Sequence, residues 1–515
     1  MYAKVMGSTL VGIDGFIVEI EVDLANGLPQ FQIVGLPDSS IRESKDRVRA
    51  AIKNIGYSFP MKRITVNLAP ADIKKEGSGF DLPMAIAILL ANENIQATKN
   101  LFDFDKMLFV GELSLDGTIQ PVKGILSLAI EAKNKELTML IVPEQNVDEA
   151  SLVQGIEVRG FSHLKEVAHF LQSGQEPSAD KRNVVAVQYF DELNNIEDFI
   201  DVKGHIQVKR AIEVAVAGMH NLLMVGPPGS GKSMLAKRIP SVLPRLTWDE
   251  MLEVTKIYSV AGELAERGKL IPTRPFRQPH HSISAAGLIG GGSNPRPGEM
   301  SLAHRGVLFL DELPEFPRHS LESMRQPLED GKVAISRARA TYLFPSQVML
   351  VGAMNPCKCG YYGTEVPEHE CQCTPLEVQR YRSRLSGPLL DRIDIQIEVP
   401  WNNIETLREQ NVGKSSKEMR ESISIARSNQ KKRFNGLQTQ FNSEMTARQV
   451  KEHCRLDQPA EDLLQTSFNQ LGFSGRSLDR ILKIARTIAD LDNSETIAIP
   501  HIAEAINYRI LDRVD

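Results

Sequence analysis

Short runs of alternating apolar and polar residues recur along the first third of the chain. In Phe16–Val22 (FIVEIEV) apolar residues occupy every second position, which is typical of a strand with one buried face. Short apolar runs predict further strands at 64–68, 106–110 and 138–142. Apolar residues at helical spacing predict a helix at 44–55, and a longer apolar stretch predicts another at 81–91. Strands that alternate with helices in this way predict an α/β domain over residues 1–172.

The rest of the chain divides by composition. Residues 173–183 (SGQEPSADKRN) are polar, contain a proline and have no periodicity, so we predict a linker over 173–189. Residues 190–400 carry further strand and helix patterns and predict a second α/β domain. The polar, helix-prone residues 401–445 predict a helical connector, and the strand-free residues 446–515 predict a small all-helical lid.

Composition narrows the class of protein. A chain of 515 residues exceeds one hydrophobic core, and 24% charged with 42% apolar residues is ordinary for a globular protein. There is no run of 18 apolar residues and no signal-peptide pattern, so we expect a cytoplasmic protein that does not enter a membrane. The net charge of −5 means that any nucleic-acid surface must be local, such as a pore or groove.

The stretch VGPPGSGKSML, residues 225–235, fits the phosphate-loop template G-x-x-x-x-G-K-[ST]. Its glycines let backbone N–H groups turn inward toward an anion, Lys232 would reach the β- and γ-phosphates, and the Ser233 hydroxyl would ligate Mg²⁺. The residues predicted to bind the nucleotide are Gly226, Pro227, Pro228, Gly229, Ser230, Gly231, Lys232, Ser233 and Met234. We therefore expect ATP and Mg²⁺ as ligands.

Two later apolar runs end in polar residues. Residues 307–310 predict a buried strand followed by Asp311 and Glu312. Because open α/β sheets bind ligands at the carboxyl ends of their strands, we expect Asp311 to hold Mg²⁺ and Glu312 to polarise the attacking water. Asn355 ends the next apolar run and would contact the γ-phosphate or that water.

Two arginines complete the predicted catalytic set. Arg392 is predicted to lie beside a helix end as an arginine finger for a neighbouring subunit. An ordinary surface ion pair with Asp391 or Asp394 is the alternative. Residues 474–491 predict an amphipathic lid helix, and Arg476 near its start is expected to reach the nucleotide of the same or a neighbouring subunit.

These five parts, in this order, resemble the AAA+ ATPases of the magnesium-chelatase and minichromosome-maintenance branch. Residues 276–305 look like the glycine-rich insertion of that branch, and residues 329–345 look like its hairpin. Nearly the whole chain resembles the ComM/YifB family, for which FQIVGLPDSSIRESKDRVRAAI, AMNPCKCGYYG and LSGPLLDRID are specific. The resemblance implies an AAA+ core, a homohexameric ring, and a DNA helicase that drives branch migration on single-stranded or branched DNA during natural transformation.

The hairpin carries the predicted DNA contacts, Lys332, Arg337 and Arg339. Arg337 and Arg339 are two residues apart, so on a strand they share a face, and six copies would form a basic collar that tracks phosphates. A solvated hairpin with ordinary surface arginines is the alternative. We predict no role beyond packing for Phe276, His280 and His281 at the start of the insertion.

Three other functions remain open at this point. One is a chelatase motor that inserts metal into a tetrapyrrole, one is a protein-remodelling ATPase, and one is a scaffold that does not hydrolyse ATP. Intact Glu312 and Arg392 argue against the scaffold.

Four cysteines lie close together in the sequence as two C-x-C pairs, Cys357 with Cys359 and Cys371 with Cys373. Four thiolates could ligate one structural Zn²⁺, although C-x-x-C is the more typical spacing and His369 could replace one ligand. Four thiols without metal in a surface loop are the alternative. Cys454 lies apart in the predicted lid and reads as a core residue.

Residues 74–91 and 110–133 resemble the Lon-type peptidase fold, whose members use a Ser–Lys dyad. Aligned on that fold, Gly79 and Leu126 occupy the dyad positions, while Ser78 and Lys123 are out of register. We therefore predict no peptidase activity and a scaffold or substrate-handling role, with an active protease as the alternative. The predicted fold is thus a Lon-like α/β domain, a P-loop AAA+ α/β core and a helical lid.

Overall fold

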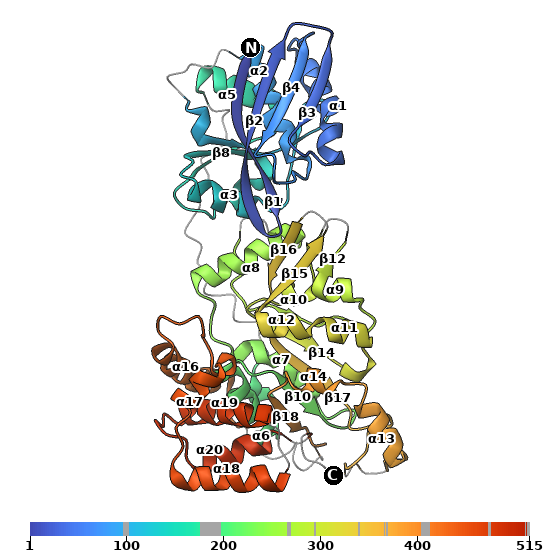
Figure 1. Ribbon diagram of the computed structural model, residues 1–515, viewed down its shortest axis with the longest axis vertical. Helices are drawn as coiled ribbons and strands as arrows, with labels where there is room; N and C mark the ends of the chain where they lie inside the picture. Colours follow the sequence, from blue (N-terminus) through green and yellow to red (C-terminus); the bar gives the residue numbers. More distant parts are fainter. Residues whose placement is uncertain are drawn as a thin grey trace. The chain divides into compact units, whose positions relative to one another are not determined.

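The computed structural model describes residues 1–95, 102–175, 197–264, 269–292, 295–337, 340–364, 366, 369–402, 413–471, 475–509 and 511 (Figure 1). The chain forms two compact units. The first contains Met1–Tyr189, Met251–Ile271 and Ile335–Phe344, and the second contains Phe190–Glu250, Pro272–Ala334 and Pro345–Asp515. Most of the predicted linker, 173–189, lies outside the described residues.

A mixed seven-stranded sheet forms the centre of the first unit, in the order β3-β4-β2-β1-β5-β8-β9. Its strands are β1 (Tyr2–Val11), β2 (Asp14–Ala25), β3 (Gln30–Val34), β4 (Arg63–Ala69), β5 (Met107–Phe109), β8 (Met139–Pro143) and β9 (Glu157–Phe161). β2 runs antiparallel to β1 and β4, and the other neighbours are parallel. All four predicted strands are confirmed, whereas β1, β3 and β9 were not predicted.

Helices cover this sheet. They are α1 (Ser39–Asn54), α2 (Asp81–Ala91), α3 (Ile125–Asn134), α4 (Val147–Ala150) and α5 (Leu164–Ser173), and a small ribbon pairs β6 (Glu112–Leu113) with β7 (Ile119–Gln120). The helices predicted at 44–55 and 81–91 are confirmed, and α2 has the predicted bounds. Every residue of α2 except Leu90 is buried, which explains why its sequence is apolar all round.

Five parallel strands form the sheet of the second unit, in the order β11-β14-β17-β10-β18. Their bounds are β10 (Leu222–Val225), β11 (Phe276–Arg277), β14 (Val307–Leu310), β17 (Met349–Met354) and β18 (Ile395–Glu398). Because all five strands are parallel, their carboxyl ends meet at one edge of the sheet. β14 confirms the strand predicted at 307–310, and β17 is the apolar run that ends at Asn355.

Shorter elements begin in this second unit, and one of them, the helix that starts at Trp248, continues into the first unit at Met251. They are α6 (Ile206–Gly218), α7 (Lys232–Val242), α8 (Trp248–Ala261), α9 (Ala285–Ile289), α10 (Glu299–Leu302), α11 (Arg318–Ser323), α12 (Arg325–Asp330), α13 (Pro375–Arg382) and α14 (Gly387–Leu390). Two hairpins pair β12 (Gly290–Gly291) with β13 (Arg296–Pro297), and β15 (Lys332–Arg337) with β16 (Ala340–Pro345). The insertion predicted over 276–305 thus contains two short helices, α9 and α10, with one short hairpin between them.

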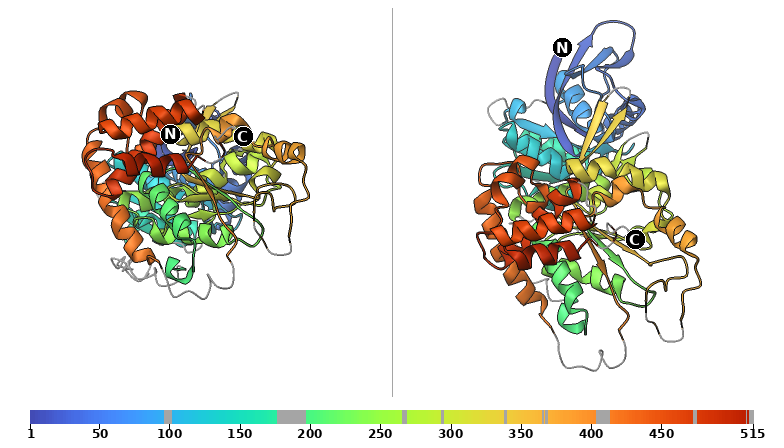
Figure 2. Two further views of the ribbon diagram at one scale, coloured as in Figure 1. Left: turned by 90° about the horizontal axis from the view of Figure 1, so that it is seen from below. Right: turned by 60° about the horizontal axis from the view of Figure 1, so that its bottom comes forward.

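The last part of the chain is helical where it is described (Figure 2). Its helices are α16 (Ser416–Arg433), α17 (Ala447–His453), α18 (Gln458–Leu471), α19 (Gly475–Leu491) and α20 (Ile499–Asn507). α16 and α19 both pack on α6, and their apolar faces join the hydrophobic core that also contains β10 and β17. Among the described residues, no helix is both long and apolar enough to cross a bilayer.

Candidate nucleotide-binding site

The phosphate loop joins β10 to α7 at the carboxyl edge of the five-stranded sheet. β10 is buried at all four positions and lies between β17 and β18, which anchors the start of the loop in the sheet. Gly231 has a φ of 86°, a left-handed conformation that favours glycine, and α7 begins at the next residue. The amino end of α7, with its partial positive charge, therefore faces the loop.

Lys232 folds back onto this loop. Its Nζ donates hydrogen bonds of 2.7 Å to the carbonyl oxygen of Gly226 and 2.8 Å to that of Pro227. A third bond of 3.3 Å reaches Oδ1 of Asn355. Burial lowers the pKa of Lys232 to about 8, because the charged form is poorly solvated there. A phosphate oxygen would compete with the two carbonyl oxygens for this ammonium group.

Ser233 and Asp311 lie together although they come from different elements. Oγ of Ser233 donates a 2.7 Å hydrogen bond to Oδ2 of Asp311, which directly follows β14. Oδ1 of Asp311 accepts a 3.0 Å bond from the backbone N–H of Glu312. A hydroxyl and a carboxylate at one point form the oxygen donor set that suits Mg²⁺, so these residues fit the predicted metal.

Glu312 lies beside a histidine for which we predicted no role beyond packing. Its backbone has a φ of 52°, and its side chain is 61% exposed. Nδ1 of His281 lies 3.4 Å from Oε2 of Glu312, and the His281 ring meets the ring of Phe316 edge-on. No local sequence pattern signalled this contact, which follows from the pairing of two strands. His281 follows β11, the strand that pairs with β14, so the two segments leave the sheet side by side.

The structure gives Arg392 a different partner from the two considered in the sequence. Its Nη2 bonds to Oε2 of Glu329 at 2.6 Å, and its Nε and Nη1 donate to the carbonyl oxygens of Arg325 and Pro388. The alternative of an ion pair with an exposed carboxylate is thus observed, but its predicted partner, Asp391 or Asp394, was wrong, because the side chain turns toward Glu329 of α12. Within the described residues, none of these bonds leads to the phosphate loop of the same chain.

The two aspartates instead pair with arginines of α19. Arg476 is 78% exposed and lies 3.3 Å from Oδ2 of Asp391. Arg480 is mostly buried and bridges Asp391 and Asp394 at 3.5 and 3.6 Å. The exposed Arg476 remains a candidate for contact with a nucleotide.

Comparison with known proteins shows what this arrangement is related to. Competence protein ComM of Haemophilus influenzae is 43% identical over 517 residues, which cover 99% of this chain and 98% of that protein. YifB of Escherichia coli K12 is 42% identical over 508 residues, covering 98% of this chain and 96% of YifB. The chain belongs to the ComM/YifB family of magnesium-chelatase-like AAA+ proteins. This family implies ATP and Mg²⁺ as ligands.

Family models place the magnesium-chelatase likeness along the chain. Residues 198–407 match magnesium chelatase, subunit ChlI; residues 20–146 match subunit ChlI of Mg-chelatase; and residues 413–509 match the ChlI C-terminal model. Lon protease 2 of Bacillus subtilis is 28% identical over 150 residues, which are 28% of this chain and 27% of that protease. The ComM/YifB chain thus combines likenesses to both groups.

The Lon-like segment lacks a Ser–Lys contact at the positions considered. Ser78 donates a hydrogen bond to Oε2 of Glu112, a carboxylate and not an amine. A Cβ built at Gly79 would have the methyl groups of Val110 and Val122 as its nearest neighbours, and Leu126 is fully buried. These surroundings are apolar where the dyad would be needed, and the absence of peptidase activity stays a prediction.

The ComM/YifB hairpin presents two of the three predicted DNA contacts at its surface. Lys332 and Arg337 are both exposed on β15. They are five residues apart, so the alternation of a strand places them on opposite faces. Arg339 lies outside the described residues, so its shared face with Arg337 stays a prediction.

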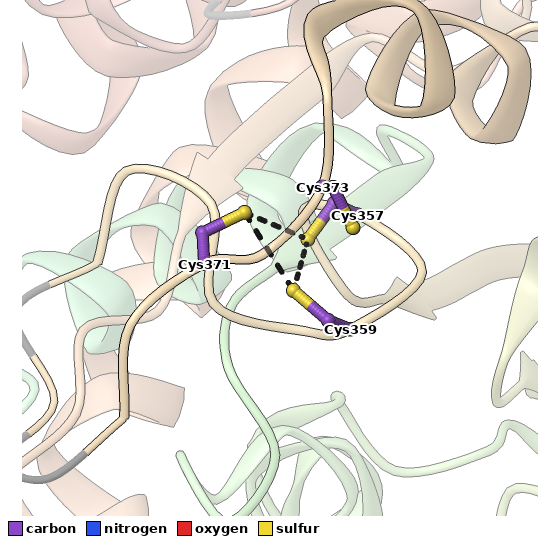
Figure 3. Close-up of side chains that lie close together, drawn as sticks. All are labelled: Cys357, Cys359, Cys371 and Cys373. Carbon is purple, nitrogen blue, oxygen red and sulfur yellow. Dashed lines mark hydrogen bonds between the residues drawn. The ribbon is translucent and has the colours of Figure 1, made fainter.

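Four cysteine thiols gather directly after β17 (Figure 3). The Sγ atoms of Cys357, Cys359, Cys371 and Cys373 all lie within 4.8 Å of one another. Sγ of Cys357 lies 3.2 Å from that of Cys359 and 3.8 Å from that of Cys371, and the Cys359–Cys371 separation is 3.6 Å. A tetrahedral zinc with Zn–S bonds of about 2.3 Å separates its sulfurs by about 3.8 Å, so the donor set fits a metal of this kind.

Proposed function

We propose that this chain is a Mg²⁺-dependent ATPase that assembles as a homohexameric ring and moves DNA. One observation carries the ATPase part of the proposal. Lys232, Ser233, Asp311, Glu312 and Asn355 come from three strand ends and meet at one edge of the parallel sheet. That edge is where open α/β sheets bind ligands.

Each of these residues has a role that follows from its chemistry. The backbone N–H groups of the loop and the Lys232 ammonium would bind the phosphates. Ser233 and Asp311 would hold Mg²⁺, which neutralises charge on the β- and γ-phosphates when bound. Glu312 would accept a proton from the attacking water, and Asn355 would orient that water or the γ-phosphate.

The ring part of the proposal rests on Arg392. Among the described residues, its three hydrogen bonds go to α12 and the start of α14, and none of them reaches its own phosphate loop. An arginine finger supplied by the next subunit would explain an arginine placed in this way. ATP would then be cleaved at the boundary between two subunits, with Arg476 as a further contact in the same or the neighbouring subunit.

The DNA part of the proposal rests on the family and on the hairpin. The relative from Haemophilus influenzae is named a competence protein. Lys332 and Arg337 are exposed on a short ribbon, where six copies could follow a phosphate backbone without reading bases. We therefore infer a cytoplasmic branch-migration helicase that acts on single-stranded or branched DNA in recombination or natural transformation.

Two other motors of the same class are the alternatives. A chelatase-type motor would insert metal into a tetrapyrrole, and a protein-remodelling motor would unfold a polypeptide. The family models favour neither, because magnesium-chelatase models match residues 20–146 of the first unit as well as residues 198–407 of the ATPase core, in a chain that is ComM-like along its length.

The cysteine cluster completes the proposed ligands. We infer that Cys357, Cys359, Cys371 and Cys373 bind one structural Zn²⁺. His369 would not be needed as a ligand, since four thiols already lie close enough together.

The test is ATP turnover by the full chain alone, with single-stranded DNA and with a four-way DNA junction. The variant Arg337→Ala/Arg339→Ala removes the hairpin charge. As a matched control, Lys431→Ala/Lys432→Ala removes the same charge from exposed positions of α16. We expect DNA to stimulate the wild-type chain and the control but not the hairpin variant. Turnover that responds neither to DNA nor to the hairpin variant would falsify the helicase function.

Turnover with a porphyrin or an unfolded protein in place of DNA separates the alternatives. Stimulation by one of these and not by DNA would favour the corresponding motor.

A further inference from the structure

The chain that follows Asn355 turns back onto the phosphate loop. Gly360 has a φ of 95°, and a Cβ at this position would lie 2.7 Å from Cδ of Pro228. A separation below 3.0 Å is one that real Cβ atoms essentially never show. The turn at Gly360 therefore touches Pro228, and only glycine allows both the backbone conformation and the close approach.

Both ends of this excursion return to the nucleotide site. Asn355 directly precedes it and bonds to Lys232 at 3.3 Å. At the other end, α13 begins two residues after Cys373, and Nε of its Arg382 donates a 3.3 Å hydrogen bond to the carbonyl oxygen of Pro356. The residue after Asn355 is thus held by the helix that follows the second cysteine pair.

The cysteines join these two ends. Cys357 is fully buried and lies two residues after Asn355, whereas the other three thiols are half-buried. The cluster brings the loop segment that leaves β17 and the loop segment that leads into α13 to one point (Figure 3). Four protein ligands would leave no open coordination position, so a metal here would be structural.

We propose that metal binding by the four cysteines positions the ATPase site. The metal closes the excursion between Asn355 and α13, seats the turn at Gly360 against Pro228, and so fixes the Asn355 side chain against Lys232. The cysteine site then positions residues for ATP hydrolysis, beyond stabilising its own loop. This inference rests on the proposed ATPase function.

The test measures zinc content and ATP turnover of the full chain. Cys371→Ser/Cys373→Ser removes two ligands, and Cys454→Ala removes the one cysteine outside the cluster as a matched control. We expect about one zinc per chain in the wild type and the control, and little in the double variant. We expect turnover in the double variant to fall about tenfold or more, with a much smaller change in ATP affinity.

Two further variants test the positioning. Asn355→Ala should lower turnover in the wild-type background but cause little further loss in the zinc-depleted variant. Both changes remove the Asn355 side chain from its position beside Lys232. Gly360→Ala should retain zinc and still lower turnover, because its Cβ displaces the turn from Pro228. This variant also answers the objection that a loss of ligands merely unfolds the loop.

The outcomes distinguish this inference from the proposed function. A wild-type chain without zinc, or a zinc-depleted variant with unchanged turnover, would overturn the positioning role and leave the ATPase intact. A wild-type chain that binds zinc but never hydrolyses ATP would overturn the proposed function. Hydrogen exchange then decides the positioning: zinc removal must raise exchange in residues 226–233, and unchanged exchange there would refute it.

Discussion

The hydroxyl of Ser233 donates a 2.7 Å hydrogen bond to the Asp311 carboxylate, although 78 residues separate them in the chain. The first belongs to α7 and the second follows β14, two elements that meet because β17 alone separates β10 from β14 in the sheet. This pair brings the hydroxyl and the carboxylate of the proposed Mg²⁺ site to one point before any ligand is considered.

Removing either partner should weaken Mg²⁺-dependent turnover. For Ser233→Ala and Asp311→Asn we expect turnover to fall about 100-fold or more, because the metal loses a ligand or the group that holds one. ATP binding measured with a chelator present should change little. Ser424→Ala, at an exposed position of α16, is the control, and an equal loss in that variant would contradict the assignment.

The pKa of Lys232 makes ATP binding depend on pH. Burial lowers this pKa to about 8, and bound phosphates would raise it again because anions favour the ammonium form. Between the two values ATP binding takes up a proton, so affinity should fall as pH rises above about 8, by up to tenfold per pH unit. Calorimetry at pH 8.5 in two buffers of different ionisation enthalpy measures the uptake. Proton release on binding would contradict the prediction.

Mixing two inactive variants tests the shared site. We expect Glu312→Gln to retain ATP binding while turnover falls about 100-fold or more, since the water loses its proton acceptor. Arg392→Ala should lower turnover about 1,000-fold. An equal mixture should recover about a quarter of wild-type activity if independent sites each pair one subunit's Glu312 with the next subunit's Arg392.

The control for this mixture is Glu329→Gln, which removes the in-chain partner of Arg392 and should leave turnover nearly unchanged. A mixture that stays inactive, although both variants assemble, would place Arg392 outside the shared site.

The stability of the C-terminal helical region should depend on the buried carboxylate of Asp490. Asp490 is 2% exposed and pairs with Arg433 and with Arg486, which is equally buried. Asp490→Ala leaves both guanidinium groups without a counter-charge, which typically costs about 3–5 kcal/mol. We expect a clearly lower melting temperature than for Asp462→Ala at an exposed position of α18. Equal melting temperatures would show that the network adds no stability.

The Lon-like segment should not cleave peptides. The Ser78 hydroxyl donates its hydrogen bond to the Glu112 carboxylate. Lys123 lies three residues before the position at which the Lon-type dyad has its lysine. We expect no casein cleavage above background by the wild-type chain, and no difference in Ser78→Ala. Cleavage that disappears in Ser78→Ala would reveal a dyad formed by other means.

Several strands of each sheet could be predicted, because the spacing of apolar residues in a short stretch of sequence indicates a buried strand. The α2 helix could be delimited from the sequence since nearly every residue in it is apolar. β1 was missed because its sequence, YAKVMGSTLV, mixes buried polar residues such as Ser8 and Thr9 with apolar ones and hides the alternation. β11 is only two residues long and carries no periodic signal.

The sequence by itself determined the chemistry of the nucleotide site. A phosphate loop has a fixed order of residues, and the carboxylates at the end of β14 follow directly from an apolar run, so both are encoded by neighbours in the chain. Only the tertiary structure decided which distant residues meet: His281 with Glu312, Arg392 with Glu329, and Gly360 with Pro228. These contacts depend on the order of strands in the sheet and on side-chain packing to within an ångström, and no local pattern of polar and apolar residues specifies either.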